Sequence, residues 1–177
     1  ITFSNAMQMI SDLGFSDGAA PNASDPLILH FRIMSNHKDI YDKIAQDLNK
    51  YLARYLLDNN HSYENNGENL GATPLKDLMG KIIIIVDKSN PLFEDTKLDE
   101  FVNLSSNSIF MRMLRYHNAK YTPDMQDLIN FNKQNMSIVL PDLNNSDDNQ
   151  SSAVIMNYGC QFIGMSFQNF DKNMEYY

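Results

Sequence analysis

Helical and strand-like hydrophobic patterns alternate along the first half of the chain. Apolar residues recur at helical spacing over 1–13, and a stripe of Leu, Ile and Tyr runs through 37–57 with Lys, Asp and Gln opposite. Between and after these segments, 27–33 and 81–86 are short runs rich in β-branched or aromatic residues, as in strands. The order helix, strand, helix, strand predicts an α/β protein with parallel strands.

Boundary residues support these elements. Ser4 and Asn36 are suitable N-caps for the two helices, and Gly14 ends the first. The polar segment 59–73 reads as a loop, and 74–79 reads as a short helical turn that Gly80 ends.

The second half carries weaker versions of the same patterns. Alternating residues predict a strand over 108–115, and Thr122 with Pro123 predicts the N-cap and first position of a helix that reaches Asn132. A turn at Gly159 then leads into a mostly apolar segment that ends at Gln168. Such a segment is typical of a strand buried on both faces, which favours a parallel sheet.

Composition narrows the class of protein. The chain has 177 residues with 43% hydrophobic content, enough for one globular domain, and a net charge of −8. An acidic chain is a poor ligand for nucleic acid or an anionic membrane. The single cysteine, Cys160, excludes an intrachain disulfide, and it reads as a small buried apolar residue. No apolar run is long enough to span a membrane, and no signal peptide is visible.

Two separated motifs resemble a known family. The run LINFNKQNMSIVLP over 128–141 is similar to F-V-x-Y-N-K-x-x-L-S-R-I-Y-P, and GCQFIGMSFQ over 159–168 is similar to G-C-Q-x-V-A-x-N-F-Q. Both patterns belong to the catalytic domain of eukaryotic-type phosphoinositide-specific phospholipase C. Upstream, PLILHFRI over 26–33 is similar to P-V-I-L-S-L-E-N, and LMGKIIIIVDK over 78–88 is similar to L-x-G-K-I-L-x-K-x-K.

The resemblance implies a fold and a domain organisation. It predicts an α/β fold that is part of a TIM-type barrel, the phospholipase C-like phosphodiesterase fold, with parallel strands and flanking helices. Residues 1–88 resemble the end of the X region and 101–177 resemble the Y region, so 1–177 is expected to be one domain, the C-terminal portion of the barrel. Because the chain begins with Ile1, we expect the natural amino terminus to lie upstream.

The resemblance also implies a chemistry whose polar residues are absent here. The family cleaves a phosphodiester with a calcium ion, two histidines and phosphate-binding cations, and both histidines precede the segment matched. Arg32 stands where the family has a calcium-binding Glu, and a cation does not bind Ca²⁺. Ile85 and Asp87 replace two phosphate-facing lysines, and Ile138 and Leu140 replace an Arg and a Tyr. The predicted site is therefore degenerate, and we assign no catalytic, cofactor-binding or metal-binding residue.

Other polar residues have ordinary structural interpretations. A hydrogen-bonded core or rim histidine is the commoner role for His30, and no metal-binding spacing links it to His37, His61 and His117. The acidic loop with Asp142, Asp147 and Asp148 lacks the Gly and distal Glu of an EF-hand. Arg112 and Arg115 read as a surface face.

Three hypotheses of function remain open. The first is a non-catalytic phospholipase C-like scaffold or protein-interaction module, intracellular or part of a large assembly such as a virion. Its partners would be a missing N-terminal half or other chains, and neither nucleic acid nor a lipid headgroup is expected. The alternative is a calcium-dependent phosphoinositide phosphodiesterase whose histidines lie upstream. In the third, the altered mouth with Arg32 and Asp87 binds a different small ligand.

Overall fold

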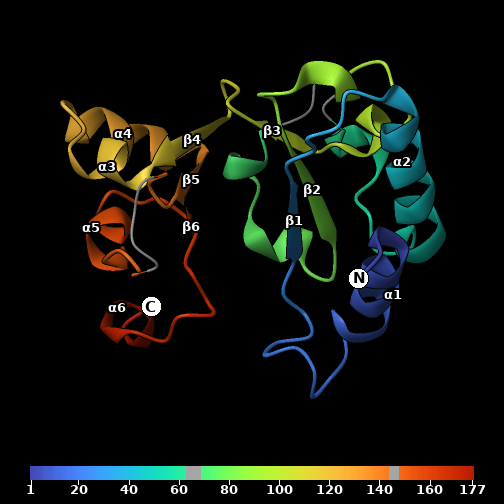
Figure 1. Ribbon diagram of the computed structural model, residues 1–177, viewed down its shortest axis with the longest axis horizontal. Coiled ribbons are helices and arrows are strands. Elements are labelled where there is room, and N and C mark those ends of the chain that lie inside the picture. Colours follow the sequence, from blue (N-terminus) through green and yellow to red (C-terminus); the bar gives the residue numbers. More distant parts are fainter. Residues whose placement is uncertain (63–68, 144–147) are drawn as a thin grey trace. The chain divides into compact units, whose positions relative to one another are not determined.

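The strand β2, Ile82–Asp87, forms the centre of the first half of the molecule (Figure 1). All six of its residues are buried, and the run of β-branched side chains from Ile82 to Val86 predicts this for the first five. β2 pairs in parallel with β1, Leu27–Phe31, and the register runs from Leu27 opposite Ile82 to Phe31 opposite Val86. A third strand, β3, Leu104–Ser106, completes a sheet of order β1-β2-β3. This arrangement confirms the predicted parallel strands.

The structure is a computed structural model that describes residues 1–62, 69–143 and 148–177. The chain divides into two units, Ile1–Ser105 and Ser106–Tyr177, and each is described by itself. The expectation of one domain over 1–177 stays a prediction.

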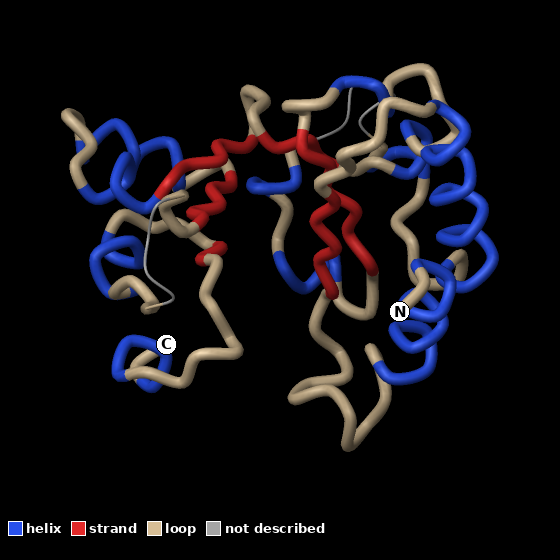
Figure 2. The backbone as a smooth tube through the Cα atoms, in the orientation of Figure 1, coloured by secondary structure: helices blue, strands red, loops and turns tan. Residues whose placement is uncertain are grey.

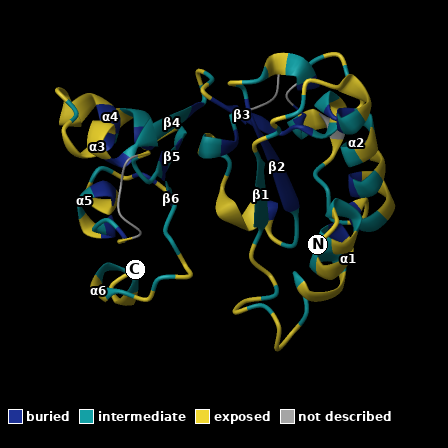
Figure 3. Ribbon diagram, in the orientation of Figure 1, coloured by how far each residue is buried: buried dark blue, intermediate teal, exposed yellow. Residues whose placement is uncertain are grey.

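Two helices supply the core of the first unit. α1, Phe3–Leu13, and α2, Lys38–Leu52, pack their apolar stripes with one face of the β1–β2 pair. That face contributes Ile82, Ile84 and Val86 to the core, and β2 has the dark blue of buried residues in Figure 3. Tyr41 of α2 is fully buried in the same core. Short 3₁₀ helices lie in the connections, at Asn59–His61, Leu70–Ala72, Leu75–Leu78, Pro91–Phe93 and Asp99–Phe101.

The second unit repeats the α/β plan on a smaller scale. Its parallel strands β4, Met111–Arg115, β5, Met136–Leu140, and β6, Phe162–Ile163, form a sheet of order β4-β5-β6 (Figure 2). Val139 of β5 and Ile163 of β6 join a core with residues of the surrounding helices. Those helices are α3, Tyr116–Lys120; α4, Met125–Asn132; α5, Ser152–Asn157; and α6, Lys172–Glu175.

The helix starts correct three predicted caps. The Thr2 hydroxyl, rather than that of Ser4, accepts a hydrogen bond from the Asn5 amide at 3.2 Å and caps α1. His37, rather than Asn36, occupies the N-cap of α2, with no hydrogen bond from its side chain to the helix. At α4 the Asp124 carboxylate accepts from the Asp127 amide, so Thr122 and Pro123 lie before the helix. Near the start of each helix several neighbouring polar residues are suitable N-caps. The backbone conformation where the helix begins determines which of them occupies the cap.

Several predicted segments are shorter than expected. β1 stops at Phe31, α2 stops at Leu52, and β4 begins only at Met111. The strand predicted to reach Gln168 is also wrong in length, because β6 covers only Phe162–Ile163. Gly80 and Gly159 both adopt positive φ, 68° and 74°, which confirms the predicted turns before β2 and β6. The helices α3, α5 and α6 and the strand β3 were not predicted, because each is too short to show a period.

Candidate functional site

The carboxyl edge of β1 and β2 carries the altered positions of the first unit. Side chains of a strand alternate between the two faces of its sheet. Leu27, Leu29 and Phe31 pack against the helical core, so His30 and Arg32 lie on the other face of β1. By the same alternation, Ile85 and Asp87 lie on the face of β2 that is opposite the core residues. These four residues therefore share one face of the sheet.

Arg32 and Asp87 form an ion pair at this edge. Arg32 Nε lies 3.6 Å from Asp87 Oδ2, and the Arg32 side chain is 55% exposed whereas that of Asp87 is 2% exposed. The other carboxylate oxygen, Oδ1, accepts a hydrogen bond from the Ser89 amide at 2.9 Å. Asp87 Oδ2 is buried without a hydrogen-bond partner. The negative charge of the Asp87 carboxylate is thus compensated by a cation of the same chain.

His30 adjoins this pair on the same face. Burial lowers the pKa of His30 from its ordinary value of 6.5, and the negative charge of Asp87 opposes that shift in pKa without overcoming it. The imidazole is therefore mainly neutral at pH 7, which agrees with the predicted role as a core or rim histidine.

The altered positions of the second unit are aliphatic on the face opposite its core. Val139 belongs to the core, so Ile138 and Leu140 on either side of it lie on the other face of β5. Neither side chain has a hydrogen-bond donor, so neither reproduces the phosphate contact of the family's Arg. At the same edge Arg115 Nη1 donates to the Pro141 carbonyl at 2.8 Å, and Asp142 accepts from the His117 amide. These contacts join the end of β4 and the first turn of α3 to the loop after β5.

Polar residues that match the family have structural partners at the opposite edge of the same sheet. The Asn132 amide donates to the Tyr158 carbonyl at 2.7 Å and accepts from the Ser137 hydroxyl at 2.6 Å. Gln161 Oε1 accepts from the Ser137 amide, and its Nε2 donates to the Asn132 and Asn135 carbonyls. We call Asn132, Ser137 and Gln161 the amino-edge network. It ties the end of α4 to the starts of β5 and β6.

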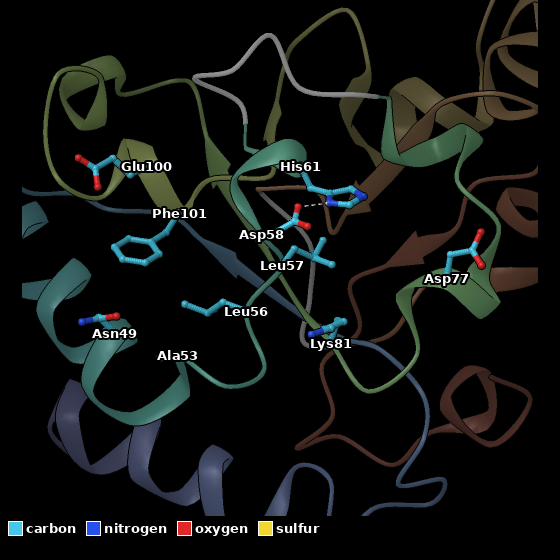
Figure 4. Close-up of a pocket in the computed structure, with 10 residues that line it drawn as sticks. All are labelled: Asn49, Ala53, Leu56, Leu57, Asp58, His61, Asp77, Lys81, Glu100 and Phe101. Atoms are coloured by element: carbon cyan, nitrogen blue, oxygen red, sulfur yellow. Dashed lines mark hydrogen bonds and ion pairs between the residues drawn. The ribbon is translucent and has the colours of Figure 1, made fainter.

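A hollow lies at the amino end of β2, away from the altered carboxyl edge (Figure 4). Its volume is about 390 Å³. The imidazole Nδ1 of His61 lies 2.8 Å from Asp58 Oδ1, and this hydrogen bond lowers the pKa of Asp58. In the close-up Glu100 and Asp77 lie at opposite ends of the hollow. The lining residues are Asn49, Ala53, Leu56, Leu57, Asp58, His61, Asp77, Lys81, Glu100 and Phe101.

The hollow and its Asp–His pair were not predicted from the sequence. The D-x-x-H spacing of Asp58 and His61 is the only local signal, and it does not indicate the helix end and strand start that complete the wall. In TIM-type barrels the amino ends of the strands generally serve stability rather than chemistry. The carboxyl edge therefore remains the place where this fold predicts an active site, and the hollow lies at the other end of the strands.

The remaining candidate residues do not converge. Arg112 donates to Asp127 at 2.9 Å and its guanidinium lies 4.0 Å from the centre of the Phe131 ring, so it fastens β4 to α4. Cys160 is buried, burial raises the pKa of its thiol, and it accepts from Asn132. Within 1–62, 69–143 and 148–177, no three His, Cys, Asp or Glu side chains are grouped closely enough to hold a metal ion. Asp147 lies outside these residues.

Known structures share this fold. No family model and no curated protein matches the chain. The crystal structure of PLC21 from L. pealei, a phospholipase C, matches 98% of the chain with a TM-score of 0.72 and 17% identity. PLC21 from S. officinalis matches the same share with a TM-score of 0.71 and 18% identity. The matched region is 27% and 26% of those chains, so the present chain spans about a quarter of their length.

At this identity the likeness shows the fold alone. The chain has the α/β fold of part of a phospholipase C-like barrel of the TIM type, with its described strands in two three-stranded sheets. This confirms the fold and the resemblance predicted from the motifs. Among the residues that the structure describes, no helix has the length and apolar character needed to cross a lipid bilayer.

Proposed function

We propose that the chain is a catalytically degenerate phospholipase C-like domain that serves as a scaffold or protein-interaction module. The observation that carries the proposal is the Arg32–Asp87 ion pair at the carboxyl edge of β1 and β2. This edge is where barrel enzymes place their chemistry. A cation stands at the position that corresponds to the family's metal-binding Glu, and a buried carboxylate of the same chain neutralises it.

The aliphatic residues of β5 support the same proposal. Ile138 and Leu140 lie at the positions where the family holds phosphate and the inositol ring, and neither has a polar atom in its side chain. The polar family residues that persist, Asn132 and Gln161, are engaged by backbone groups. A domain that only binds other proteins needs its folded framework, and it does not need the groups that bind metal and phosphate. Such a surface would be used in a large assembly, of which a virion is one example.

An active phosphodiesterase is the second candidate, and the fold shared with PLC21 favours it. Because the chain spans about a quarter of those structures, this candidate requires residues beyond these 177 to supply two histidines and enough acids to bind calcium. It also requires the barrel mouth to accept Arg32 beside the metal, which costs electrostatic free energy.

A hydrolysis assay separates the two candidates. Purified full-length protein is incubated with vesicles that contain phosphatidylinositol bisphosphate, with calcium or with EDTA, beside an active phospholipase C as positive control. We expect no calcium-dependent release of inositol phosphates.

A matched pair of variants makes the assay specific. Calcium-dependent release that is unchanged in Arg54→Gln, an exposed arginine after α2, but altered in Arg32→Gln would overturn the proposal. The alternative would then hold, with Arg32 at the reacting centre.

A further inference from the structure

We infer that the hollow at the amino end of β2 binds an aliphatic organic cation, a methylene chain that carries an ammonium group at one or both ends. The inference goes beyond the proposed function, because a scaffold does not need a ligand at this place. It rests on the order in which acidic and apolar side chains follow one another along the hollow.

The hollow has the size of a site for a small ligand. Its volume of about 390 Å³ is within the range of roughly 300–1,000 Å³ that is usual for ligand pockets. All of its lining residues belong to the first unit, and they come from the end of α2, the loop after it, and the segments on either side of β2. A second hollow of about 440 Å³ shares His61 and Asp77 with the first, so the two adjoin at these residues.

Carboxylates outnumber cations along the lining. Asp58, Asp77 and Glu100 are present with one cation, Lys81. The hydrogen bond with His61 lowers the pKa of Asp58, so this carboxylate is ionised at pH 7. In the part of the chain that the structure describes, neither Asp77 nor Glu100 forms an ion pair. The lining therefore favours a positively charged ligand over a neutral or anionic one.

Apolar side chains separate the acidic ends of the hollow. In Figure 4, Leu56 and Leu57 lie between Glu100 and Asp77, and the Phe101 ring adds to the same wall. Methylene groups gain free energy when they leave water for such a wall, whereas a hydrated inorganic cation does not. The order of acid, apolar wall and acid is therefore complementary to an aliphatic chain with an ammonium group at each end.

Hydrogen bonds to β2 hold the wall of the hollow in place before a ligand binds. The Ile82 amide donates to the Tyr55 carbonyl at 2.8 Å. The side chain of buried Asn103 donates to the His61 carbonyl at 3.0 Å and accepts from the Ile84 amide at 2.8 Å. Both ends of the segment that forms the wall are thus attached to the sheet, which lowers the entropic cost of binding.

Diaminobutane is the first probe, measured by isothermal titration calorimetry on full-length protein at low ionic strength. We expect saturable binding of this dication, and binding of butylamine that is about three- to fivefold weaker, because one ion pair with an exposed carboxylate is lost. Butanediol has the same chain without charge, and it should show no saturable binding.

Two variants and a matched control locate the binding. Glu100→Gln and Asp77→Asn each remove one charge at an end of the hollow, and each should weaken binding of diaminobutane about three- to fivefold. Asp12→Asn removes the same charge from an exposed position on α1 that is not part of the lining. This control should bind diaminobutane as the wild type does.

N-acetyl-lysine methylamide distinguishes the two sources of such a cation, because it presents one ammonium group on the four-carbon chain of a lysine side chain. Binding as tight as that of diaminobutane supports a lysine of a partner protein, and tighter binding of diaminobutane supports a free diamine. Absence of saturable binding of both amines, equal binding of butanediol, or unchanged binding in Glu100→Gln and Asp77→Asn overturns the inference. Calcium-dependent hydrolysis is a separate readout, so failure of this inference and failure of the proposed function are distinguishable.

Discussion

The ion pair of the first sheet and the hydrogen-bond network of the second sheet lie at opposite strand ends within their own sheets. In the first unit the polar pair, Arg32 and Asp87, lies at the carboxyl edge of β1 and β2. In the second unit the amino-edge network of Asn132, Ser137 and Gln161 lies at the start of β5 and β6. The first pair departs from the family pattern, whereas Asn132, Ser137 and Gln161 match it.

The comparison shows that a matching polar residue is no sign of retained chemistry. The amino-edge network satisfies buried backbone groups, and any barrel with this turn requires those hydrogen bonds. The residues Ile138 and Leu140 at the carboxyl edge have no polar side-chain atom, so they take no part in such hydrogen bonds. Differences from the family pattern are therefore most informative about function when they lie at the carboxyl edge of the sheet.

Core substitutions should affect the first unit most strongly. Ile84→Ala should lower the free energy of unfolding by about 3–4 kcal/mol, because a fully buried side chain leaves a cavity. The matched change Ile138→Ala, on the half-buried face of β5, should cost about 1 kcal/mol. Urea denaturation of full-length protein measures both losses. Equal losses would contradict the placement of Ile84 in the core and Ile138 outside it.

The amino-edge network should be the main polar determinant of the second unit. Asn132→Ala leaves the Tyr158 carbonyl and the Ser137 hydroxyl without their partner, and should cost about 2–3 kcal/mol. The control Asn130→Ala, an exposed residue of the same helix, should change stability by less than about 0.5 kcal/mol. Thermal unfolding of the two variants provides the measurement. A loss at Asn130 as large as that at Asn132 would remove the structural role assigned here.

The ion pair of the first unit should contribute less than the network. Arg32→Ala should destabilise the protein by about 1 kcal/mol, a value kept small by the exposure of Arg32 to water. In a cycle with Asp87→Ala, the double variant should lose less stability than the two single variants summed. Strict additivity would show that the two side chains do not interact in solution.

The smallest effect should be a pH dependence from His30. Its pKa is lower in the folded chain than the ordinary 6.5, so the unfolded chain binds the proton more tightly. Stability should therefore fall as pH decreases from about 6.5 through the folded pKa of His30. His30→Asn should flatten this slope, because asparagine does not titrate in this range. Denaturation curves between pH 7 and pH 5 measure this change in stability. An increase in stability toward pH 5 would contradict the prediction.

The local hydrophobic pattern was enough to predict the long helices and strands, but it did not predict the short ones. The run at 82–87 and the stripe of α2 have clear periods, and both became the predicted strand and helix. The caps of α1, α2 and α4 were wrong because neighbouring polar residues have similar capping ability. The hollow beside His61 was missed because its wall comes from segments far apart in the chain.

The order of apolar runs by itself determined the parallel α/β plan, because burial on both faces demands an unbroken hydrophobic strand. The sequence alone also identified the residues that differ from the family pattern, which are Arg32, Ile85, Asp87, Ile138 and Leu140. Only the tertiary structure decided that Arg32 pairs with Asp87 and that Ser137 bonds to Asn132. Strand register and loop closure bring these partners together, and neither is encoded in the local spacing of residues.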